Sequence, residues 1–270
     1  MDTEDFEFVR DLVRKRSAIV LEKKKSYLVE SRLMPLARRE GFNSIGEVVA
    51  KLRLTGFTTL HSKVVEAMTT NETSFFRDIA PFDAVRKVIL PELINKRMTG
   101  RQLRIWCAAS STGQEPYSLA MLIRENFPQL INWDVRILAT DLSTQVLEKA
   151  RSGSFNQIEV NRGLPAALIV KYFDRQGMNW QLKDVIREMI EFKPLNLIET
   201  WPTLPQMDMV FIRNVLIYFD VQTKKDILGR IRNLLRPDGY LFLGGAESTY
   251  NLDDAYVRNE IEKASIYRLR

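Results

Sequence analysis

The residues from Leu103 to Leu122 constrain the fold most, because they have the pattern of a buried strand, a tight loop and a helix. Apolar residues alternate along Leu103–Cys107, and every residue of Ala108–Gly113 is small, so a ligand could approach the backbone closely there. Glu115 and Pro116 suit the first turn of a helix, because an acid faces the positive end of the helix dipole and proline needs no N–H partner. In doubly wound α/β proteins, a turn of this kind holds adenosine-containing cofactors.

The loop also indicates which adenosine cofactor fits. Gly113 is its only glycine, so the glycine spacing of dinucleotide-binding loops is missing, which favours S-adenosylmethionine because it has no pyrophosphate. A second buried strand is predicted over 135–140, and Asp141 after it could accept hydrogen bonds from both ribose hydroxyls. Taken alone, Asp141 could equally be a turn or capping residue. Ser143 is predicted to cap the helix that follows.

Composition excludes several kinds of site. The single cysteine, Cys107, rules out internal disulfides and cysteine-based zinc sites, and its place in a strand favours a small buried hydrophobe over a nucleophile. The single histidine, His61, has no catalytic-triad arrangement and is expected at the surface or between helices. No metal site is predicted. The acidic start is not typical of a signal peptide and no apolar run approaches a membrane span, so we expect a cytoplasmic protein.

Residues 1–68 are predicted to form a small domain of four or five helices, because apolar residues recur there at helical spacing. Gly41 and Ser44 suit the end of one helix and the start of the next, and Pro35 is expected near a helix bend or start. Residues 69–80 are predicted to be a connector between this domain and the next. The apolar stripes are Phe6, Val9 and Val13, then Ile45, Val48, Val49 and Leu52, then Leu60, Val64, Val65 and Met68.

From residue 81 to 270, helices and strands alternate, which indicates an α/β domain with a doubly wound, mostly parallel, Rossmann-like sheet. Residues 154–189 break the alternation and are predicted to form a small inserted antiparallel β subdomain. Pro237–Gly239 is predicted as a turn, and Ile266–Leu269 as a last edge strand. The other predicted strands are 103–107, 135–140, 178–183, 190–193, 207–213 and 240–245, and the predicted helices are 82–96, one after Glu115, 144–151, 165–173 and 221–235.

Taken together, five segments resemble one family, the bacterial chemotaxis receptor methyltransferases of the CheR type. They occur in the family's order and spacing over nearly the whole chain, although the last is common to many methyltransferases. The segments are Thr70-Asn-Glu-Thr-Ser-Phe-Phe-Arg77, Trp106-Cys-Ala-Ala-Ser-Ser-Thr-Gly-Gln-Glu-Pro-Tyr-Ser118, Ala139-Thr-Asp-Leu-Ser143, Arg213-Asn-Val-Leu-Ile-Tyr-Phe219 and Leu235-Arg-Pro-Asp-Gly-Tyr-Leu241.

The resemblance implies a set of site residues for S-adenosylmethionine. Arg77 is suited to the cofactor's carboxylate, since a guanidinium presents a planar fork of donors, Glu115 matches an acid near the amino group, and Asp141 matches the ribose-binding acid. Tyr218 matches a tyrosine beside the methyl acceptor and is the expected catalytic residue. The other cofactor-binding residues implied are Asn71, Thr73, Asn196, Leu197, Arg213 and Asn214.

The activity implied by the resemblance is methylation of glutamate side chains of chemotaxis receptors, which forms methyl esters for sensory adaptation. A carboxylate is ionised at neutral pH and the cofactor activates its own methyl group, so the reaction needs no general base. The family also uses an arginine from the helix after the connector, but Arg86 and Arg97 do not align clearly, and that role stays open. Two alternatives also stay open: a methyltransferase of RNA or a small molecule, and a non-catalytic adaptor with the same fold.

The N-terminal helices are basic. Between Arg10 and Arg53 there are 12 Lys and Arg residues against 5 Asp and Glu residues. Such a surplus could bind nucleic acid or an acidic protein, or be a solvated helix face. The resemblance favours docking on the acidic helical bundle of the receptors by a monomeric enzyme, with no nucleic acid and no direct membrane insertion.

Some family members grip a C-terminal pentapeptide of the receptor as an added edge strand of the inserted subdomain, and they resemble one another in a longer, glycine-rich loop there. Here the stretch Phe173–Gln181 is short and holds Gly177 alone, and Met178 and Trp180 could pack on the subdomain's own helix. We therefore expect an enzyme that acts independently of such a tail.

Overall fold

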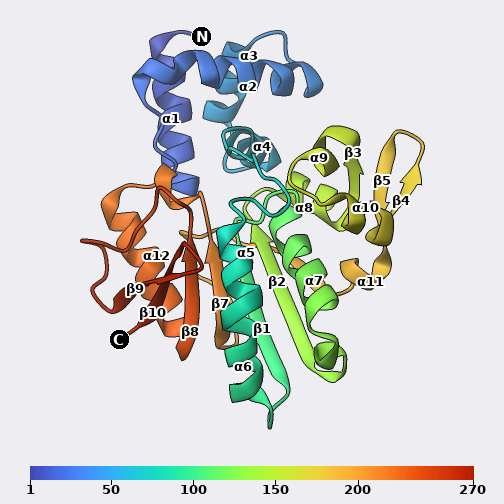
Figure 1. Ribbon diagram of the computed structural model, residues 1–270. Helices are drawn as coiled ribbons and strands as arrows, with labels where there is room; N and C mark the ends of the chain where they lie inside the picture. Colours follow the sequence, from blue (N-terminus) through green and yellow to red (C-terminus); the bar gives the residue numbers. More distant parts are fainter. The chain divides into compact units, whose positions relative to one another are not determined.

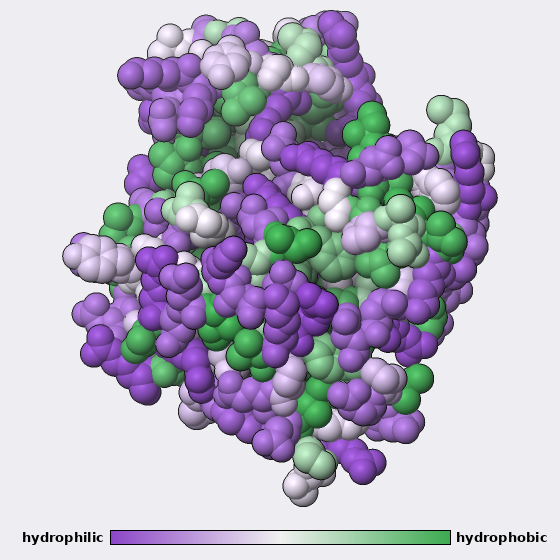
Figure 2. Space-filling view, in the orientation of Figure 1, coloured by the Kyte–Doolittle hydropathy of each residue, from purple (hydrophilic) through white to green (hydrophobic).

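A computed structural model describes residues 1–270. None of its helices combines the length and the apolarity needed to span a bilayer, and hydrophilic residues cover much of the surface seen in Figure 2. The chain forms two compact units, and two short segments from its second half group with the N-terminal helices. The first unit comprises Met1–Thr70, Asn196–Thr200 and Tyr218–Lys224, and the second comprises Asn71–Leu195, Trp201–Ile217 and Lys225–Arg270.

Four α-helices and a short 3-10 helix make up the N-terminal part of the first unit (Figure 1). They form at the predicted apolar stripes because each stripe can be buried against the others; Val9, Val13 and Val49 have no exposed surface. Ser44 begins its helix as predicted, and its hydroxyl accepts a hydrogen bond from the Glu47 N–H at 3.1 Å. The helices are α1 (Thr3–Ser17), η1 (Lys23–Lys25), α2 (Ser26–Arg39), α3 (Ile45–Leu54) and α4 (Thr59–Ala67).

The structure decides between the alternatives left open for two residues of this unit. Pro35 does not start a helix but lies inside α2, so the Ser31 carbonyl has no N–H four residues further along the helix. His61 is not at the surface, because it is only 5% exposed. Its Nδ1 accepts a hydrogen bond from the Thr58 N–H at 3.1 Å and completes a capping box at the start of α4.

The second unit is built on a seven-stranded sheet of order β6-β2-β1-β7-β8-β10-β9. The pairs β1–β2, β1–β7, β2–β6 and β7–β8 are parallel, and only β10 and β9 run antiparallel to their neighbours. The predicted fold class, a mostly parallel α/β sheet after a helical domain, is confirmed. The strands are β1 (Gln102–Ala108), β2 (Asp134–Asp141), β6 (Ile190–Pro194), β7 (Met207–Ile212), β8 (Leu235–Leu243), β9 (Tyr256–Ile261) and β10 (Ala264–Leu269).

Helices lie on both faces of this sheet. In Figure 1, α5, α6 and α7 lie in front of the strands and α12 lies behind β8. The predicted helix at 82–96 is a continuous helical run with a π-helical middle part, η2. The helices are α5 (Ala80–Ala84), η2 (Val85–Ile89), α6 (Leu90–Arg97), α7 (Gln114–Asn126), η3 (Pro128–Asn132), α8 (Thr144–Ser152), α11 (Asp184–Arg187), η4 (Leu216–Tyr218) and α12 (Val221–Leu234).

The end of the chain differs from the prediction. Strand β10 is not at the edge, because β9, which we did not predict, pairs with its outer side. An edge strand is half solvated, so β9 carries polar residues such as Arg258 and Glu260 and lacks a clear apolar pattern. The predicted turn Pro237–Gly239 lies within the bounds of β8, where the pairing with β7 shifts register between Met207 and Met209.

The predicted insertion forms a three-stranded antiparallel sheet of order β3-β5-β4. The expected packing of Met178 is wrong, since its side chain lies at the β4–β5 turn and Met178 is 90% exposed. Trp180 is partly buried, and its Nε1 donates to the Gln157 Oε1 at 2.9 Å. The elements are β3 (Ser154–Asn156), α9 (Gln157–Asn161), α10 (Ala166–Tyr172), β4 (Phe173–Gln176) and β5 (Asn179–Leu182).

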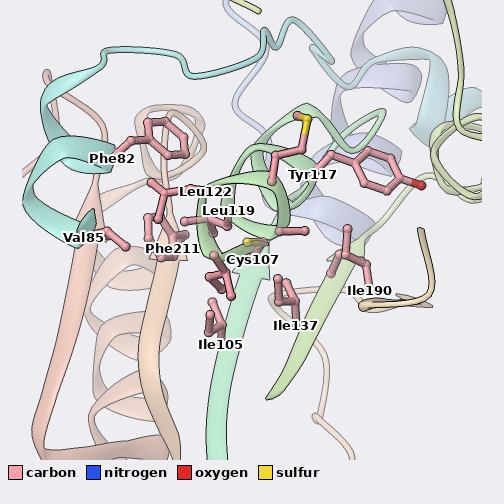
Figure 3. Close-up of a cluster of buried hydrophobic side chains, with 14 of the residues drawn as sticks. Phe82, Val85, Ile105, Cys107, Tyr117, Leu119, Leu122, Ile137, Ile190 and Phe211 are labelled. Atoms are coloured by element: carbon pink, nitrogen blue, oxygen red, sulfur yellow. The ribbon is translucent and has the colours of Figure 1, made fainter. Parts of the chain in front are cut away.

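Cys107 lies in the core of the second unit, as predicted. Figure 3 shows it among apolar side chains of the central strands and α7, including Ile105, Leu119 and Ile137. The side chain is fully buried, and burial raises the pKa of its thiol well above the ordinary value. The protonated thiol is therefore a packing group and not a nucleophile.

Candidate active site

The loop between β1 and α7 follows the carboxyl end of the central strand, where open α/β sheets bind ligands. It is tightly wound, with Ala109, Ser111 and Gly113 at φ values of 55°, 51° and 93°. A Cβ atom on Gly113 would lie 3.0 Å from the Tyr117 ring and 3.1 Å from the Ala150 Cβ. Glycine is therefore required at this helix start for two reasons, its conformation and its close contacts.

Asp141 ends β2 and joins two loops. Its Oδ2 accepts a hydrogen bond from the Ser111 N–H and its Oδ1 from the Ser143 N–H, both at 2.9 Å, and the residue is 6% exposed. The turn-stabilising role considered from the sequence is therefore present. Binding of ribose by the same carboxylate stays a prediction.

Two serine hydroxyls fasten the predicted connector to the β1–α7 region. The Ser111 hydroxyl donates to the Asn71 carbonyl at 2.7 Å. The Ser118 hydroxyl accepts from the Phe76 N–H at 2.9 Å and donates to the Gln114 carbonyl at 2.6 Å. Because Ser118 is fully buried, the Phe76 N–H would have no other partner without it.

The connector backbone is strained around Arg77. Phe76 and Asp78, on either side of it, have φ values of 46° and 55°, a region that non-glycine residues rarely occupy. Such a conformation costs about 1–3 kcal/mol and persists only where the surroundings enforce it. Strain of this kind is concentrated at functional sites. Binding of the cofactor by Arg77 stays a prediction.

Arg213 enforces that conformation. It follows β7, and its side chain is only 2% exposed. One terminal nitrogen, Nη2, donates to the Arg77 carbonyl and to the Asp78 Oδ2, and the other, Nη1, donates to the Glu115 Oε2, all at 2.9 Å. A single buried guanidinium therefore joins the connector to the first turn of α7.

Glu115 is the carboxylate partner of Arg213. Burial raises the pKa of the Glu115 carboxyl above its ordinary value, although the charges of Arg213 and Arg77 act in the opposite direction. The Arg77 guanidinium donates to the Glu72 carbonyl at 3.1 Å within the connector. Arg77 remains partly exposed, as does Thr73.

Asn71, Arg77, Glu115, Asp141, Arg213 and Asn214 thus lie in one unit. Asn196, Leu197 and Tyr218 belong to the unit of the N-terminal helices. There, the Asn196 side-chain amide donates to the Arg16 carbonyl at 2.7 Å, and the Tyr218 carbonyl accepts from the Val20 N–H at 3.1 Å. Leu197 is buried.

The two arginines considered for the open role are engaged elsewhere. Arg97 donates to Asp208 and Asp238. Asp208 is the second residue of β7 and therefore lies at the amino end of that strand, away from its carboxyl end. Arg86 pairs with Asp83 on its own helix. Neither contact involves the residues around Arg213.

Sequence reasoning missed four residues of this arrangement. Ser111 and Ser118 lie inside a segment that carried the resemblance, and Asp78 directly follows another, but neighbouring residues received the roles. Glu247 was missed entirely, although it follows two glycines just beyond the last parallel strand.

Comparison with known families agrees with this arrangement. Residues 4–69 match the CheR methyltransferase, all-alpha domain, and residues 71–264 match the CheR methyltransferase, SAM binding domain. The chain belongs to the CheR methyltransferase family. It is an S-adenosylmethionine-dependent chemotaxis protein methyltransferase.

Curated relatives of this CheR family member match it over almost their whole length. It is 46% identical to chemotaxis protein methyltransferase 1 of Pseudomonas aeruginosa, with 98% of each chain covered. It is 42% identical to chemotaxis protein methyltransferase Cher2 of Pseudomonas putida, again over 98% of each chain. Chemotaxis protein methyltransferase 1 of Vibrio cholerae is 37% identical, over 100% of this chain and 98% of that one.

The residues present in this CheR family member fit S-adenosylmethionine. The β1–α7 loop offers small residues in a tightly wound backbone, so an adenosine could lie against it. Carboxylates at Asp141 and Glu115 and the cation of Arg77 are the groups that would hold ribose, an ammonium and a carboxylate. The cofactor, when bound, supplies a methyl group already activated by its sulfonium.

The raised pKa of Glu115 makes stability depend on pH. Above about pH 4.3, the ordinary value for a glutamate, the unfolded chain releases this proton more readily than the folded protein does, so folding loses stability as pH rises through the folded pKa. We expect the difference in free energy of unfolding between the wild type and Glu115→Gln to decrease from pH 4 to pH 8 in urea titrations.

Glu125→Gln is a matched control for which the pH dependence of stability should have the opposite direction. Hydrogen bonds from Lys171 and Tyr172 lower the pKa of Glu125, so its contribution to stability is present above the ordinary value and is lost on acidification. The difference in free energy of unfolding between the wild type and Glu125→Gln should therefore increase with pH. If the difference for Glu115→Gln also increased with pH, a raised pKa of Glu115 would be contradicted.

Proposed function

We propose that this enzyme transfers a methyl group from S-adenosylmethionine to glutamate side-chain carboxylates of chemotaxis receptors. One observation carries the proposal: Arg213 fastens the Arg77 segment to Glu115 beside the carboxyl ends of β1 and β7, in a chain that belongs to the CheR family. The product is a glutamate methyl ester, which serves sensory adaptation.

The individual roles follow the chemistry of each residue. Asp141 would bind the ribose hydroxyls, Arg77 the carboxylate of the cofactor and Glu115 its amino group. Tyr218 would place the acceptor carboxylate. Asn71, Thr73, Asn196, Leu197, Arg213 and Asn214 would complete the cofactor site.

The reaction asks little of a catalytic acid or base. The acceptor glutamate is ionised at neutral pH, so its oxygen is already nucleophilic and no residue has to remove a proton from it. The enzyme's contribution is alignment and the exclusion of water, and alignment alone can supply about 7–11 kcal/mol. The protonated, buried Cys107 and the capping residue His61 are consistent with chemistry that uses neither side chain.

Docking is proposed for the basic N-terminal domain, residues 1–68, with 69–80 as the connector and 81–270 as the catalytic domain. Lys24 has no carboxylate within the distance of an ion pair, and Lys23 and Lys25 pair only with acids on the same unit. Positive charge of this kind attracts the acidic helical bundle of a receptor. The proposed enzyme acts as a monomer, in the cytoplasm, and binds no nucleic acid.

Labelled S-adenosylmethionine with receptor-containing membranes tests the activity. We expect alkali-labile label on the receptor, since methyl esters hydrolyse in base, and loss of most of that label with Asp141→Ala. Ser143→Ala is the control: it removes a helix cap at a cost of about 1 kcal/mol but leaves the Asp141 carboxylate in place.

Other outcomes identify the alternatives. If RNA or a small molecule became labelled and the receptor did not, the substrate would be that molecule and not the receptor. Binding of S-adenosylhomocysteine in calorimetry without any transfer would indicate a non-catalytic adaptor.

Independence from a receptor tail is also proposed. The β4–β5 connection is a short turn at Gly177 and the exposed Met178, and the Trp180 indole is held by Gln157. A short turn of this kind leaves little room to frame a further strand. Tethering would raise the local concentration of substrate without changing the chemistry.

Calorimetry with an Asn-Trp-Glu-Thr-Phe peptide tests this independence. We expect no detectable heat of binding at peptide concentrations up to the millimolar range. A dissociation constant at or below about 10 μM, equivalent to about −7 kcal/mol, would contradict it.

A further inference from the structure

One carboxylate, that of Glu247, lies where the loops after β7 and β8 meet. Its Oε2 accepts hydrogen bonds from the backbone N–H groups of Asn214 at 2.8 Å and Gly244 at 2.6 Å. Its Oε1 accepts from the Ile217 N–H at 3.3 Å. Bonds to an ionised acceptor are stronger than bonds between neutral groups, so this side chain clamps the two loops together.

The clamped backbone includes a residue in a left-handed conformation. Asn214 has a φ of 60°, which is uncommon for a non-glycine residue although asparagine adopts it more often than most. A Cβ atom on Gly244 would lie 2.7 Å from the Asn214 Nδ2 and 2.8 Å from both the Asn214 N and the Glu247 Oε2. The two loops are therefore in direct backbone contact, and glycine at position 244 permits the contact.

The clamped segment carries the predicted site. Arg213 immediately precedes Asn214, and Tyr218 immediately follows Ile217. The side chain of Arg213 is held separately by Glu115 and Asp78. Glu247 therefore controls the part of the segment that Arg213 does not, namely the backbone from Asn214 to Ile217.

We propose that Glu247 is a positioning residue for methyl transfer, and this rests on the proposed function. It sets the left-handed turn at Asn214, and through that turn the placement of the Asn214 side chain at the cofactor. A carboxylate suits this task because it accepts from three N–H groups and has no proton to donate. An amide has one acceptor oxygen, and its NH2 group would face a backbone N–H.

Glu247→Gln tests the proposal, with Glu260→Gln on the exposed strand β9 as the matched control. Both proteins are compared with the wild type at a temperature at which circular dichroism shows each to be folded. We expect Glu247→Gln to weaken binding of S-adenosylhomocysteine at least about fivefold, which is about 1 kcal/mol. Turnover at saturating cofactor and receptor should fall at least about tenfold, because small misalignments are costly in an in-line transfer. Glu260→Gln should change neither.

A purely structural role would lower the melting temperature of Glu247→Gln and leave both quantities within about twofold of the wild type, which would overturn the proposal. If Glu247→Gln does not fold, Glu247→Asp keeps the charge with a reach shorter by one methylene. Weakened cofactor binding in the folded Glu247→Asp protein would then support the proposal, and unchanged binding and turnover would overturn it. The calorimetric measurement needs no methyl acceptor, so failure of the proposed receptor activity would be seen separately, as missing ester in the wild type.

Discussion

The candidate site depends on one buried cation, the guanidinium of Arg213. Its terminal nitrogens contact the Glu115 carboxylate, the Arg77 carbonyl and the Asp78 carboxylate, all at 2.9 Å. A charge that is almost inaccessible to water must be compensated by partners of good geometry, and removing one partner of such a pair typically costs about 3–5 kcal/mol. The strained backbone around Arg77 is therefore an arrangement that this cation can hold and that the connector would not adopt on its own.

Other polar side chains bind loop backbone groups at the carboxyl ends of the parallel strands. Asp141 gathers two backbone N–H groups after β2, Glu247 gathers three between the loops after β7 and β8, and the hydroxyls of Ser111 and Ser118 fasten the connector. The loops that follow these strands lack the regular backbone hydrogen bonds of the sheet. Side chains must therefore form hydrogen bonds with the backbone groups of the loops. Polar side chains thus hold these loops together by binding their backbone groups.

Much of the fold could be predicted because its signals are local. The alternation of Leu103, Ile105 and Cys107 marks the central strand, and the stripe Phe6, Val9 and Val13 marks the first helix, since each pattern is read within a few residues. Strand β9 could not be predicted, because an edge strand needs only one buried face and this one is largely polar. The placement of residues 196–200 and 218–224 with the N-terminal helices could not be predicted either, because it depends on contacts between distant parts of the chain.

The contrast between local signals and long-range contacts applies to the candidate site as well. The resemblance implied cofactor-binding roles for Arg77, Glu115 and Asp141, but their hydrogen-bond partners did not follow from spacing. The contact between Arg213 and Glu115 joins residues that are 98 positions apart. The role of Glu247 can be recognised only when the loops after β7 and β8 are known to touch. The sequence alone shows an acid beyond a strand and does not show the three N–H groups that it binds.

Amide hydrogen exchange in Arg213→Met tests most directly whether this cation holds the connector in place. Methionine keeps much of the length and apolar volume of the side chain and removes the charge and its donors. We predict that peptides covering residues 71–80 exchange at least about tenfold faster than in the wild type, as expected when a local structure loses more than about 1.4 kcal/mol, while peptides from β1 and β2 keep their protection. Unchanged exchange of residues 71–80 in the folded variant would contradict the account.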